Sequence, residues 1–404
     1  MNAGSTTKEN HRERWHKPSV CSAFVLTGLS ATVLSLVACK PHDFPEYAAN
    51  YREFAYVTNG GSNTVSVIDV VHVRLDREIQ VGQNPTGVSA HPTRNEIYVV
   101  NTGNGQSNGS ISVIDSEKNA VVGTIPVRKS PYFLEVDAKH DIGYVANSGS
   151  NSVSVIDLRA HREISVIGVG EGPGLTRLSP DGKTLVVTNR LGNSVTLVDT
   201  TGKLVRSVIQ GCPGATDAVI LPDSSKAFVA CSSGHQIMAI ALAHQADANR
   251  PARADAMEAM LDVGHTPVQL ALKPDGGELF VSNFDSDSIS EVVTSTDDVG
   301  GSYLMGSRPV RGLVSGDNSL LYVSNFNAQN LSMYGIDDGK RVGIIRVGDG
   351  PDAMAFSAGG NLLFVVDARS GDVAVIRTSS KSLFTLLPTG RHPNAITVKA
   401  FHTH

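Results

Sequence analysis

The chain has 404 residues, a formal net charge of −5 at pH 7, 41 % hydrophobic residues and 18 % charged residues. A chain of this size can bury a large core, and its length does not require a second domain. Residues 39–404 lack a basic stripe or a polybasic run, so nucleic acids and anionic membrane surfaces are not expected partners.

Residues 1–38 have the pattern of an export signal. Four basic residues, all within the first 17 positions, precede an apolar run from Val20 to Leu34. This run is too short to predict a membrane span. We therefore expect residues 1–38 to be removed from the mature protein.

The end of this leader, Leu36-Val37-Ala38-Cys39, resembles the lipobox of bacterial lipoproteins. The resemblance implies that residues 1–38 are a lipoprotein signal peptide, that Cys39 is lipidated and that residues 39–52 tether the protein to a membrane. Lys40 follows the cysteine, which in that family favours the outer membrane, facing the periplasm. The alternative is an ordinary signal peptide with a chance cysteine.

A tetrad with an apolar start and a polar end repeats along the rest of the chain. Its copies end at positions 59, 101, 147, 189, 231, 283, 325 and 367, so the steps are 42, 46, 42, 42, 52, 42 and 42 residues. The first copy is Tyr56-Val-Thr-Asn59. A repeat of about 42 residues is typical of one four-stranded propeller blade.

The rest of each repeat predicts β-strands. A Gly-, Ser- and Asn-rich turn follows the tetrad, and then an alternating apolar run such as Val65-Ser-Val-Ile-Asp69. A third strand ends at Val-Gly, and a proline two or three residues later opens the next strand. Each unit is therefore predicted to be an antiparallel meander of strands a, b, c and d, in which strand a begins near the proline.

Counting the strands predicts an all-β propeller of eight four-stranded blades over residues 53–400. The first unit begins at its b strand, Glu53 to Asn59, and the chain ends on an unpaired a strand, Pro393 to Ala400. These two strands are expected to pair and to complete the last blade, which removes free sheet edges. Seven blades is the alternative, if the irregular fifth unit is not a full blade.

Two features distinguish the fifth unit. Cys212 and Cys231 are predicted to lie at one rim of the same blade, either as a disulfide or as two separate buried thiols. Residues 241–261 are rich in Ala, Met and Glu, which favours a short helical insertion between strands c and d.

The tetrad, the Val-Ser-Val-Ile-Asp run and the Val-Gly-x-x-Pro link resemble the YVTN-repeat β-propeller proteins, a largely bacterial secreted or periplasmic family, over roughly residues 50–400. Because these residues recur in nearly every unit, we expect them to build the blade, and Asn59 and its copies to bond the backbone of the b–c turn. The resemblance implies the fold and leaves the function open, since lactonases, haem d1 domains and quinoprotein-associated proteins have a similar pattern.

Residues that differ between blades are the candidates for a ligand site. They gather on the rim that carries the d–a and b–c connections, where their mixed charges suit a polar ligand or a peptide loop. The alternative is that they pair across blades, as Glu135 with Arg177 and Asp217 with Arg311 could. The candidates are Phe133, Asp217, Gln269, Arg311 and Asp352, together with an aromatic pair, Phe284 and Phe326, directly after two tetrads.

Motifs for catalysis or for cofactors are missing from the sequence, which contains no nucleophile elbow, phosphate loop, dinucleotide fingerprint or haem-attachment motif. His235 and His265 lack the spacing of a zinc site. We therefore expect neither cofactor nor metal. If the protein is a hydrolase, Glu135, Arg177 and His392 are the candidate catalytic residues.

The sequence leaves three functional hypotheses open. The first is a non-catalytic, monomeric, lipid-anchored propeller that recognises a protein, a glycan or a small polar ligand at one rim. The second is a lactonase-like hydrolase. The third is an accessory protein of a periplasmic haem or quinone enzyme.

Overall fold

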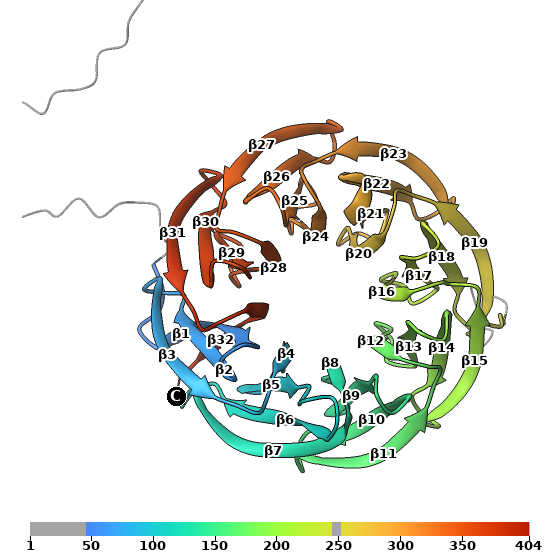
Figure 1. Ribbon diagram of the computed structural model, residues 1–404, viewed down its shortest axis with the longest axis horizontal. Helices are drawn as coiled ribbons and strands as arrows, with labels where there is room; N and C mark the ends of the chain where they lie inside the picture. Colours follow the sequence, from blue (N-terminus) through green and yellow to red (C-terminus); the bar gives the residue numbers. More distant parts are fainter. Residues whose placement is uncertain (1–45, 245–251, 404) are drawn as a thin grey trace, which may run out of the picture. The chain divides into compact units, whose positions relative to one another are not determined.

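Eight four-stranded antiparallel sheets are arranged in a ring around one axis (Figure 1) in the computed structural model, which describes residues 46–244 and 252–403. The predicted eight-bladed propeller is therefore confirmed, and the seven-bladed alternative is wrong. The lipidation site predicted at Cys39 and the leader before it lie outside the described residues.

The blades share one order of strands, from a at the axis to d at the outside (Figure 1). The a strands are β4 (Pro85–Ala90), β8 (Pro131–Asp137), β12 (Pro173–Leu178), β16 (Ala215–Ile220), β20 (Pro267–Leu272), β24 (Pro309–Val314), β28 (Pro351–Phe356) and β32 (Pro393–His402). The b strands are β1 (Tyr51–Asn59), β5 (Glu96–Asn101), β9 (Ile142–Asn147), β13 (Thr184–Asn189), β17 (Lys226–Cys231), β21 (Glu278–Asn283), β25 (Leu320–Asn325) and β29 (Leu362–Asp367). The c strands are β2 (Thr64–Asp69), β6 (Asn108–Asp115), β10 (Ser152–Asp157), β14 (Ser194–Asp199), β18 (Gln236–Ala241), β22 (Ser288–Val293), β26 (Asn330–Gly335) and β30 (Asp372–Arg377). The d strands are β3 (Arg74–Gln80), β7 (Ala120–Lys129), β11 (Arg162–Gly168), β15 (Leu204–Gln210), β19 (Ala256–Asp262), β23 (Asp298–Leu304), β27 (Lys340–Arg346) and β31 (Ser382–Pro388).

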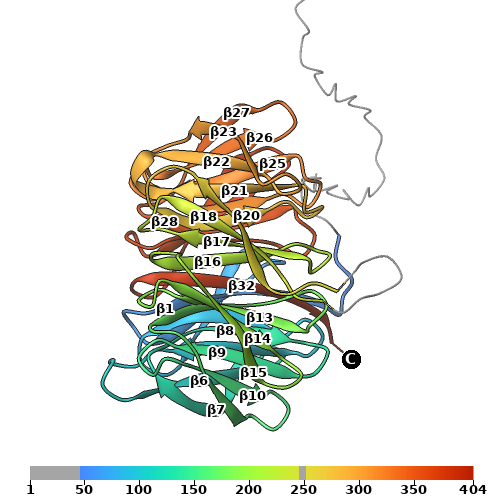
Figure 2. The same ribbon diagram turned by 90° about the vertical axis from the view of Figure 1, so that its right-hand side faces the viewer.

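We number the blades by their b strands, so that β1 belongs to the first and β29 to the eighth. The face with the b–c turns and the d–a links is called the upper face, and the face with the a–b and c–d turns is called the lower face. Figure 2 shows the ring from the side, with the C-terminus on one of these faces. β32 is an a strand, so it runs from the upper to the lower face. The face that carries the C-terminus is therefore the lower face.

The hydrophobic core lies between blades rather than within them. In one cluster, Tyr56 and Val67 of the first blade pack with Val88 and Val99 of the second. Alternation along the b and c strands sends β-branched side chains to both sheet faces, and each face is covered by the neighbouring blade. A blade is therefore stable only as part of the ring.

The tetrad asparagine braces the upper end of the b–c hairpin in six blades. Its Nδ2 donates to a Ser or Thr hydroxyl of the adjacent c strand at 2.8–2.9 Å, as Asn59 does to Ser66. The expected bond to the turn backbone is found only as a weaker addition, in Asn147. The glycine of the Val-Gly motif covers this brace: a Cβ on Gly170 would lie 2.5 Å from Asn189 Cγ, so no larger residue fits.

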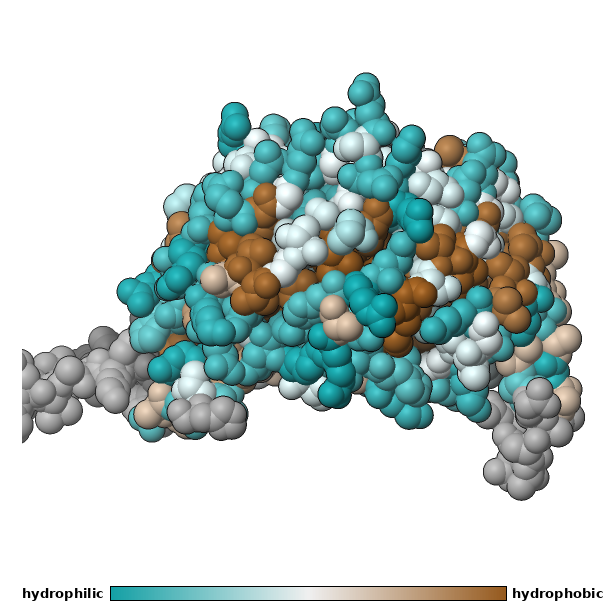
Figure 3. Space-filling view, turned by 90° about the horizontal axis from the view of Figure 1, so that it is seen from below, coloured by the Kyte–Doolittle hydropathy of each residue, from teal (hydrophilic) through white to brown (hydrophobic). Residues whose placement is uncertain are grey.

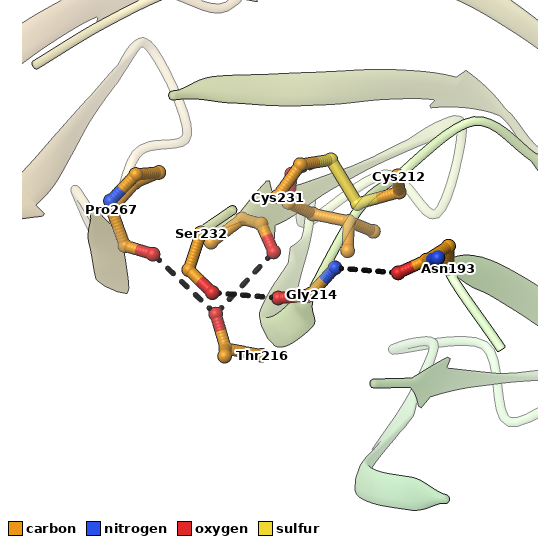
Figure 4. The surroundings of a disulfide bond; sticks show 9 residues. Asn193, Cys212, Gly214, Thr216, Cys231, Ser232 and Pro267 are labelled. Carbon is orange, nitrogen blue, oxygen red and sulfur yellow. Dashed lines mark hydrogen bonds between the residues drawn. A yellow bond between two sulfur atoms is a disulfide. The ribbon is translucent and has the colours of Figure 1, made fainter. Parts of the chain in front are cut away.

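A disulfide between Cys212 and Cys231 replaces this brace in the fifth blade, with the two Cα atoms 4.8 Å apart (Figure 4). Cys231 is the last residue of the tetrad there, in place of asparagine. The segment before β16 curls back to bring Cys212 within reach, and Asn193 holds it by accepting from the Gly214 N–H at 3.1 Å. The structure therefore contains the bonded pair and not the two separate thiols.

The predicted helix in residues 241–261 is wrong where the structure describes it. Residues 256–262 form β19, the outer strand of the fifth blade, in register with β18. Helix propensity favours Ala, Met and Glu by only about half a kcal/mol per residue. Pairing with the open edge of β18 outweighs that preference. The c–d connection is long, as expected, and Asp255 fixes it to the fourth blade by accepting two hydrogen bonds of 2.7 Å from Arg206.

The outer d strands carry the exposed edges of all eight sheets. Each has a one-residue register shift against its c strand, as between Val155 and Ile156 opposite β11. Such bulges make an edge a poor template for further strands. Apolar side chains still form a band on the outer side (Figure 3), and the most exposed of those on d strands are Leu204, Met257 and Leu304.

The described residues contain one helical turn, Phe284–Ser286, so no helix among them has the length or apolarity to cross a membrane.

The first blade is completed by both ends of the chain, as predicted. β32 pairs with β1 from Tyr51↔His402 to Asn59↔Pro393, two residues longer at the lower face than expected. Two buried charged residues fasten this blade to its neighbours. Glu53 Oε1 accepts from the Ala358 N–H of the eighth blade at 2.6 Å, and Lys399 Nζ donates to the His91 carbonyl of the second at 2.7 Å.

We expect a chain shortened to end at Thr389 to lose the cooperative unfolding transition of the full protein. Without β32, the inner edge of β1 and the sides of two blades are exposed. Circular dichroism and size-exclusion chromatography would show aggregation or a broad, early transition. A chain that ends at His402 retains the whole strand and is the control. Native-like melting of the shorter chain would disprove the closure.

The eighth blade has an acid pair at the position of the brace. Asp367 replaces the tetrad asparagine and is fully buried. Burial, and then a hydrogen bond with Asp372, raise the pKa of Asp367 to about 8. Its Oδ2 also accepts the Gly348 N–H at 2.9 Å. The pair therefore holds a proton at neutral pH.

Asp367→Asn is expected to remove a pH dependence of stability. In the unfolded chain an aspartate loses its proton near pH 3.9. Between about pH 4 and 8 the folded state retains a proton that the unfolded state has lost, so stability falls as pH rises, by at most about 1.4 kcal/mol per pH unit. Urea unfolding from pH 5 to 9 should show a shallower decline in Asp367→Asn. Asp372→Ser removes the hydrogen bond but leaves Asp367 buried, so its decline should lie between those of the other two proteins. Equal slopes in all three proteins would contradict the shared proton.

Candidate functional site

Most of the residues singled out from the sequence lie on the inner a strands. Most of them form one group around the axis, which we call the axial cluster. The a strand is the innermost in its sheet, so one of its edges has no neighbouring strand and its backbone groups need other partners. The axial cluster consists of Glu135, Arg177, Asp217, Gln269, Arg311 and Asp352.

Three members of the axial cluster supply acceptors to that open edge in the next blade. Asp217 Oδ2 accepts the Leu270 N–H at 2.9 Å, Gln269 Oε1 accepts the Gly312 N–H at 2.7 Å and Glu135 Oε1 accepts the Leu178 N–H at 3.3 Å. These contacts explain why acceptor side chains stand at these positions. For these three residues, bracing between blades is the observed role.

Arg177 is held by several partners. Its Nε donates to the Ala218 carbonyl at 3.1 Å, and its two terminal nitrogens lie 3.5 Å from Glu135 Oε2 and 3.7 Å from Asp217 Oδ1. Its guanidinium also lies 5.2 Å from the ring centre of Phe133. The expected pair of Glu135 and Arg177 is therefore confirmed. Burial raises the pKa of Glu135, although the positive charge of Arg177 acts in the opposite direction.

Arg311 is the least constrained member of the axial cluster. Its side chain is 40 % exposed, and its one ion pair within residues 46–244 and 252–403 joins Nε to Asp352 Oδ1 at 3.3 Å. The expected contact with Asp217 is not formed within the hydrogen-bonding or ion-pair distance. Burial acts to lower the pKa of Arg311, but the charges of Asp352 and then Asp217 raise it above its ordinary value. The two terminal nitrogens remain available to a ligand.

The structure does not assemble the three candidate catalytic residues. Glu135 and Arg177 meet, whereas His392 is exposed on the link into β32, where its carbonyl accepts the Gly60 N–H at 3.0 Å. In the described part of the chain, no hydrogen bond or ion pair joins His392 to either of the other two. A general base beside an oxyanion stabiliser is therefore not formed by this set.

Phe284 and Phe326 lie on the upper face, but each is partly covered by an arginine. The Arg308 guanidinium lies 4.9 Å from the ring centre of Phe284, and the Arg369 guanidinium lies 4.3 Å from that of Phe326. Both rings are half-buried rather than exposed. Cation–π contact of this kind orders the arginines at the surface.

Sequence reasoning missed two features of the upper face. Tyr132, next to Phe133, is 48 % exposed. It belongs to the blade opposite that of Arg311 in the ring, yet it lies close enough to contribute to the raised pKa of Arg311. His235 and His265 are brought together with ring centres 4.5 Å apart, although they are 30 positions apart in the sequence. Within residues 46–244 and 252–403, no group of three or more metal-binding side chains is formed.

The sequence and structure were compared with known proteins. The family model described as YNCE-like beta-propeller matches residues 137–399. No curated protein gives a significant match.

Several solved structures share the fold. Citrobacter koseri AztD is 15 % identical with a TM-score of 0.65, and the alignment covers 88 % of this chain and 99 % of that one. A putative 6-phosphogluconolactonase from Bacteroides uniformis is 14 % identical with a TM-score of 0.58, covering 87 % of this chain and 100 % of that one. Kuenenia stuttgartiensis hydrazine synthase is 20 % identical with a TM-score of 0.55, covering 69 % and 91 %. At these identities the likeness extends to the fold alone.

We expect Asp217→Ala to destabilise the protein by about 1–3 kcal/mol, because the Leu270 N–H would lose its acceptor in a buried position. Asp217→Asn retains one acceptor oxygen and should lose less. Urea unfolding at pH 7 measures both changes. A loss below about 0.5 kcal/mol in Asp217→Ala, the range of ordinary surface substitutions, would show that this residue is not a brace.

Proposed function

The chain belongs to the YNCE-like β-propeller family, and within it we propose a non-catalytic binding protein that captures a small ligand bearing a carboxylate or phosphate group. The ligand would enter from the upper face and reach the axial cluster. A propeller fold hosts unrelated functions, so this proposal depends on the site and not on the family.

The observation that carries the proposal is the incomplete pairing of Arg311. Its guanidinium is held from one side by Asp352 and is 40 % exposed, with its planar pair of terminal nitrogens uncommitted. A guanidinium presented in this way matches a carboxylate or phosphate in two parallel hydrogen bonds. Tyr132, also partly exposed nearby, would supply an aromatic surface and a hydroxyl.

Binding is better supported than catalysis by the state of the other members of the axial cluster. Glu135, Asp217 and Gln269 each use an acceptor oxygen on a backbone N–H, and Arg177 donates to the Ala218 carbonyl and lies within 3.7 Å of two carboxylates. These side chains are therefore held in place without a ligand. Ordered surroundings favour affinity because little ordering accompanies binding.

Arg311→Gln should weaken anion binding at least tenfold, because the charge-assisted hydrogen bonds are lost. Isothermal titration with succinate and with inorganic phosphate measures the change. Arg308→Gln is the control, since Arg308 lies on the same face and rests on Phe284. Failure of both anions to bind the unaltered protein, or an equal loss in the control, would contradict the proposal. A ligand of another kind, such as a protein or glycan, would then have to be sought.

The hydrolase hypothesis has weaker support. A fold shared with putative lactonases and the contact between Glu135 and Arg177 favour it, whereas the position of His392 does not. Turnover of glucono-1,5-lactone that Glu135→Gln abolishes would make it the better explanation. For a role beside a haem or quinone enzyme, the support is limited to fold likeness.

We also propose that the protein is lipid-anchored at Cys39 in the bacterial envelope, on the periplasmic side of the outer membrane. The support is the lipobox-like sequence before Cys39. β1 begins on the lower face, and only six residues lie between Cys39 and Glu46, so the two can be at most about 25 Å apart. An anchor there would keep the lower face near the membrane and the axial cluster open to the periplasm. Attachment to a surface would also raise the effective concentration of the site.

Cys39→Ala should abolish acylation and move the protein from the membrane fraction to the soluble fraction, while the circular dichroism spectrum stays unchanged. Metabolic labelling with a fatty acid and fractionation of cells measure the two effects. Cys212→Ala, which breaks the disulfide, should leave labelling intact and is the control. Continued labelling of Cys39→Ala would contradict the anchor.

A further inference from the structure

A groove opens on the lower face between the seventh and eighth blades, far from the axial cluster along the strands. Its walls are the a–b turns of both blades and the c–d turn of the eighth, and its volume is about 670 Å³. We propose that this groove binds a neutral mono- or disaccharide. A volume of this size is typical of small-molecule sites.

The floor of the groove is aromatic and contains a free hydroxyl. Tyr322 and Phe356 line it with ring centres 5.8 Å apart, meeting edge to face. Tyr322 is 1 % exposed, yet no hydrogen bond joins its hydroxyl to another described residue. Of the corresponding tyrosines in the first three blades, Tyr56 donates to Asn119 and Tyr98 to Glu96, both at 2.6 Å. Tyr144, like Tyr322, has no hydrogen-bond partner among the described residues, but Tyr322 differs from it in lining this groove. A buried phenol that lines a groove without a partner is a donor for a ligand.

The walls of the groove carry one negative and one positive side chain, Asp317 and Lys381. Asp317 uses Oδ1 to accept from the hydroxyls of Ser315 and Ser319 at 2.5 and 2.8 Å, which leaves Oδ2 for a ligand. Lys381 stands on the c–d turn that forms another wall. The two charges balance, which favours a neutral ligand over an anion or a cation. Hydroxyl groups of a saccharide suit both, and its C–H face suits the aromatic floor.

Tyr322 is kept in its protonated form, as a donor must be. Burial raises its pKa, and the negative charge of Asp317 raises it further. The hydrogen bonds from Ser315 and Ser319 lower the pKa of Asp317, so that this carboxylate stays ionised. A donor and an acceptor of fixed charge therefore face the same space at neutral pH.

The groove is open because a polar bridge that joins another pair of blades is missing here. Between the second and third blades Arg94 and His161 both bond Glu96 across the lower face. The equivalent residues at the groove are Asn318, Lys381 and, in place of Glu96, the apolar Leu320. The adjacent turn contains Gly316, on which a Cβ would meet nothing within 4 Å. The groove is therefore a local departure from the repeat and not a property of every blade.

The test is saturation-transfer difference NMR and isothermal titration with D-glucose and maltose on the folded protein. We expect binding of at least one of them, weakened about tenfold or more in Tyr322→Phe, the loss expected for a hydrogen bond of about 1.4 kcal/mol. Tyr144→Phe is the matched control, because Tyr144 is the buried tetrad tyrosine of the third blade. It should bind as the unaltered protein does.

A second variant, Ser379→Trp, places a bulky ring at the exposed mouth of the groove and should block binding without altering the core. Arg311→Gln should leave saccharide binding unchanged, which separates this site from the axial cluster. Three results would overturn the proposal. The first is that the unaltered protein binds neither saccharide, the second is that both groove variants bind as the unaltered protein does, and the third is that glucose 6-phosphate binds more tightly than the neutral saccharides.

Discussion

Ring closure through the pairing of β1 with β32 is the constraint on which the rest of this structure depends. Every blade buries its two faces against neighbours, so one missing contact between blades would expose the sides of two sheets. The closing blade brings together strands more than 330 residues apart in the chain. Its fastening by Glu53 and Lys399, each hydrogen-bonded to a different neighbouring blade, fixes the register in which the ends meet.

The brace at the upper end of each blade shows how a repeat tolerates change. Six blades use an asparagine bonded to a hydroxyl, the fifth uses the disulfide of Cys231 and the eighth uses an acid pair at Asp367. All three join the b strand to a neighbouring segment at the same level. The chemistry can vary because a buried asparagine or aspartate needs only a hydrogen-bond partner, and a disulfide leaves no polar group to satisfy.

The fold could be predicted from the sequence because strand period, turn residues and motif spacing repeat eight times and support one another. The prediction failed where the context of a single blade decided the outcome. Residues 256–262 have helical composition, but an open strand edge beside them favours a strand. The pairing of Cys212 with Cys231 stayed open for a similar reason, because it depends on the path of the segment before β16, which Asn193 of the preceding blade holds.

The axial cluster was only partly predictable for a similar reason. The sequence predicted that Asp217 and Gln269 lie together on one rim, but their partners are backbone N–H groups of the next blade. A backbone group has no signature in the sequence, so a brace and a ligand residue look alike there. Arg311 was distinguished from them only by what surrounds it in three dimensions.

The position of β1 has a mechanical consequence. It is paired on both sides, with β2 and with β32, and its first residue lies at the edge of the ring from which the N-terminal segment emerges. A pull on that segment acts along the strand, so the hydrogen bonds of two ladders are loaded together in shear and not opened one at a time. The end of the chain that would bear a load is therefore attached at a strand that is held along both of its edges.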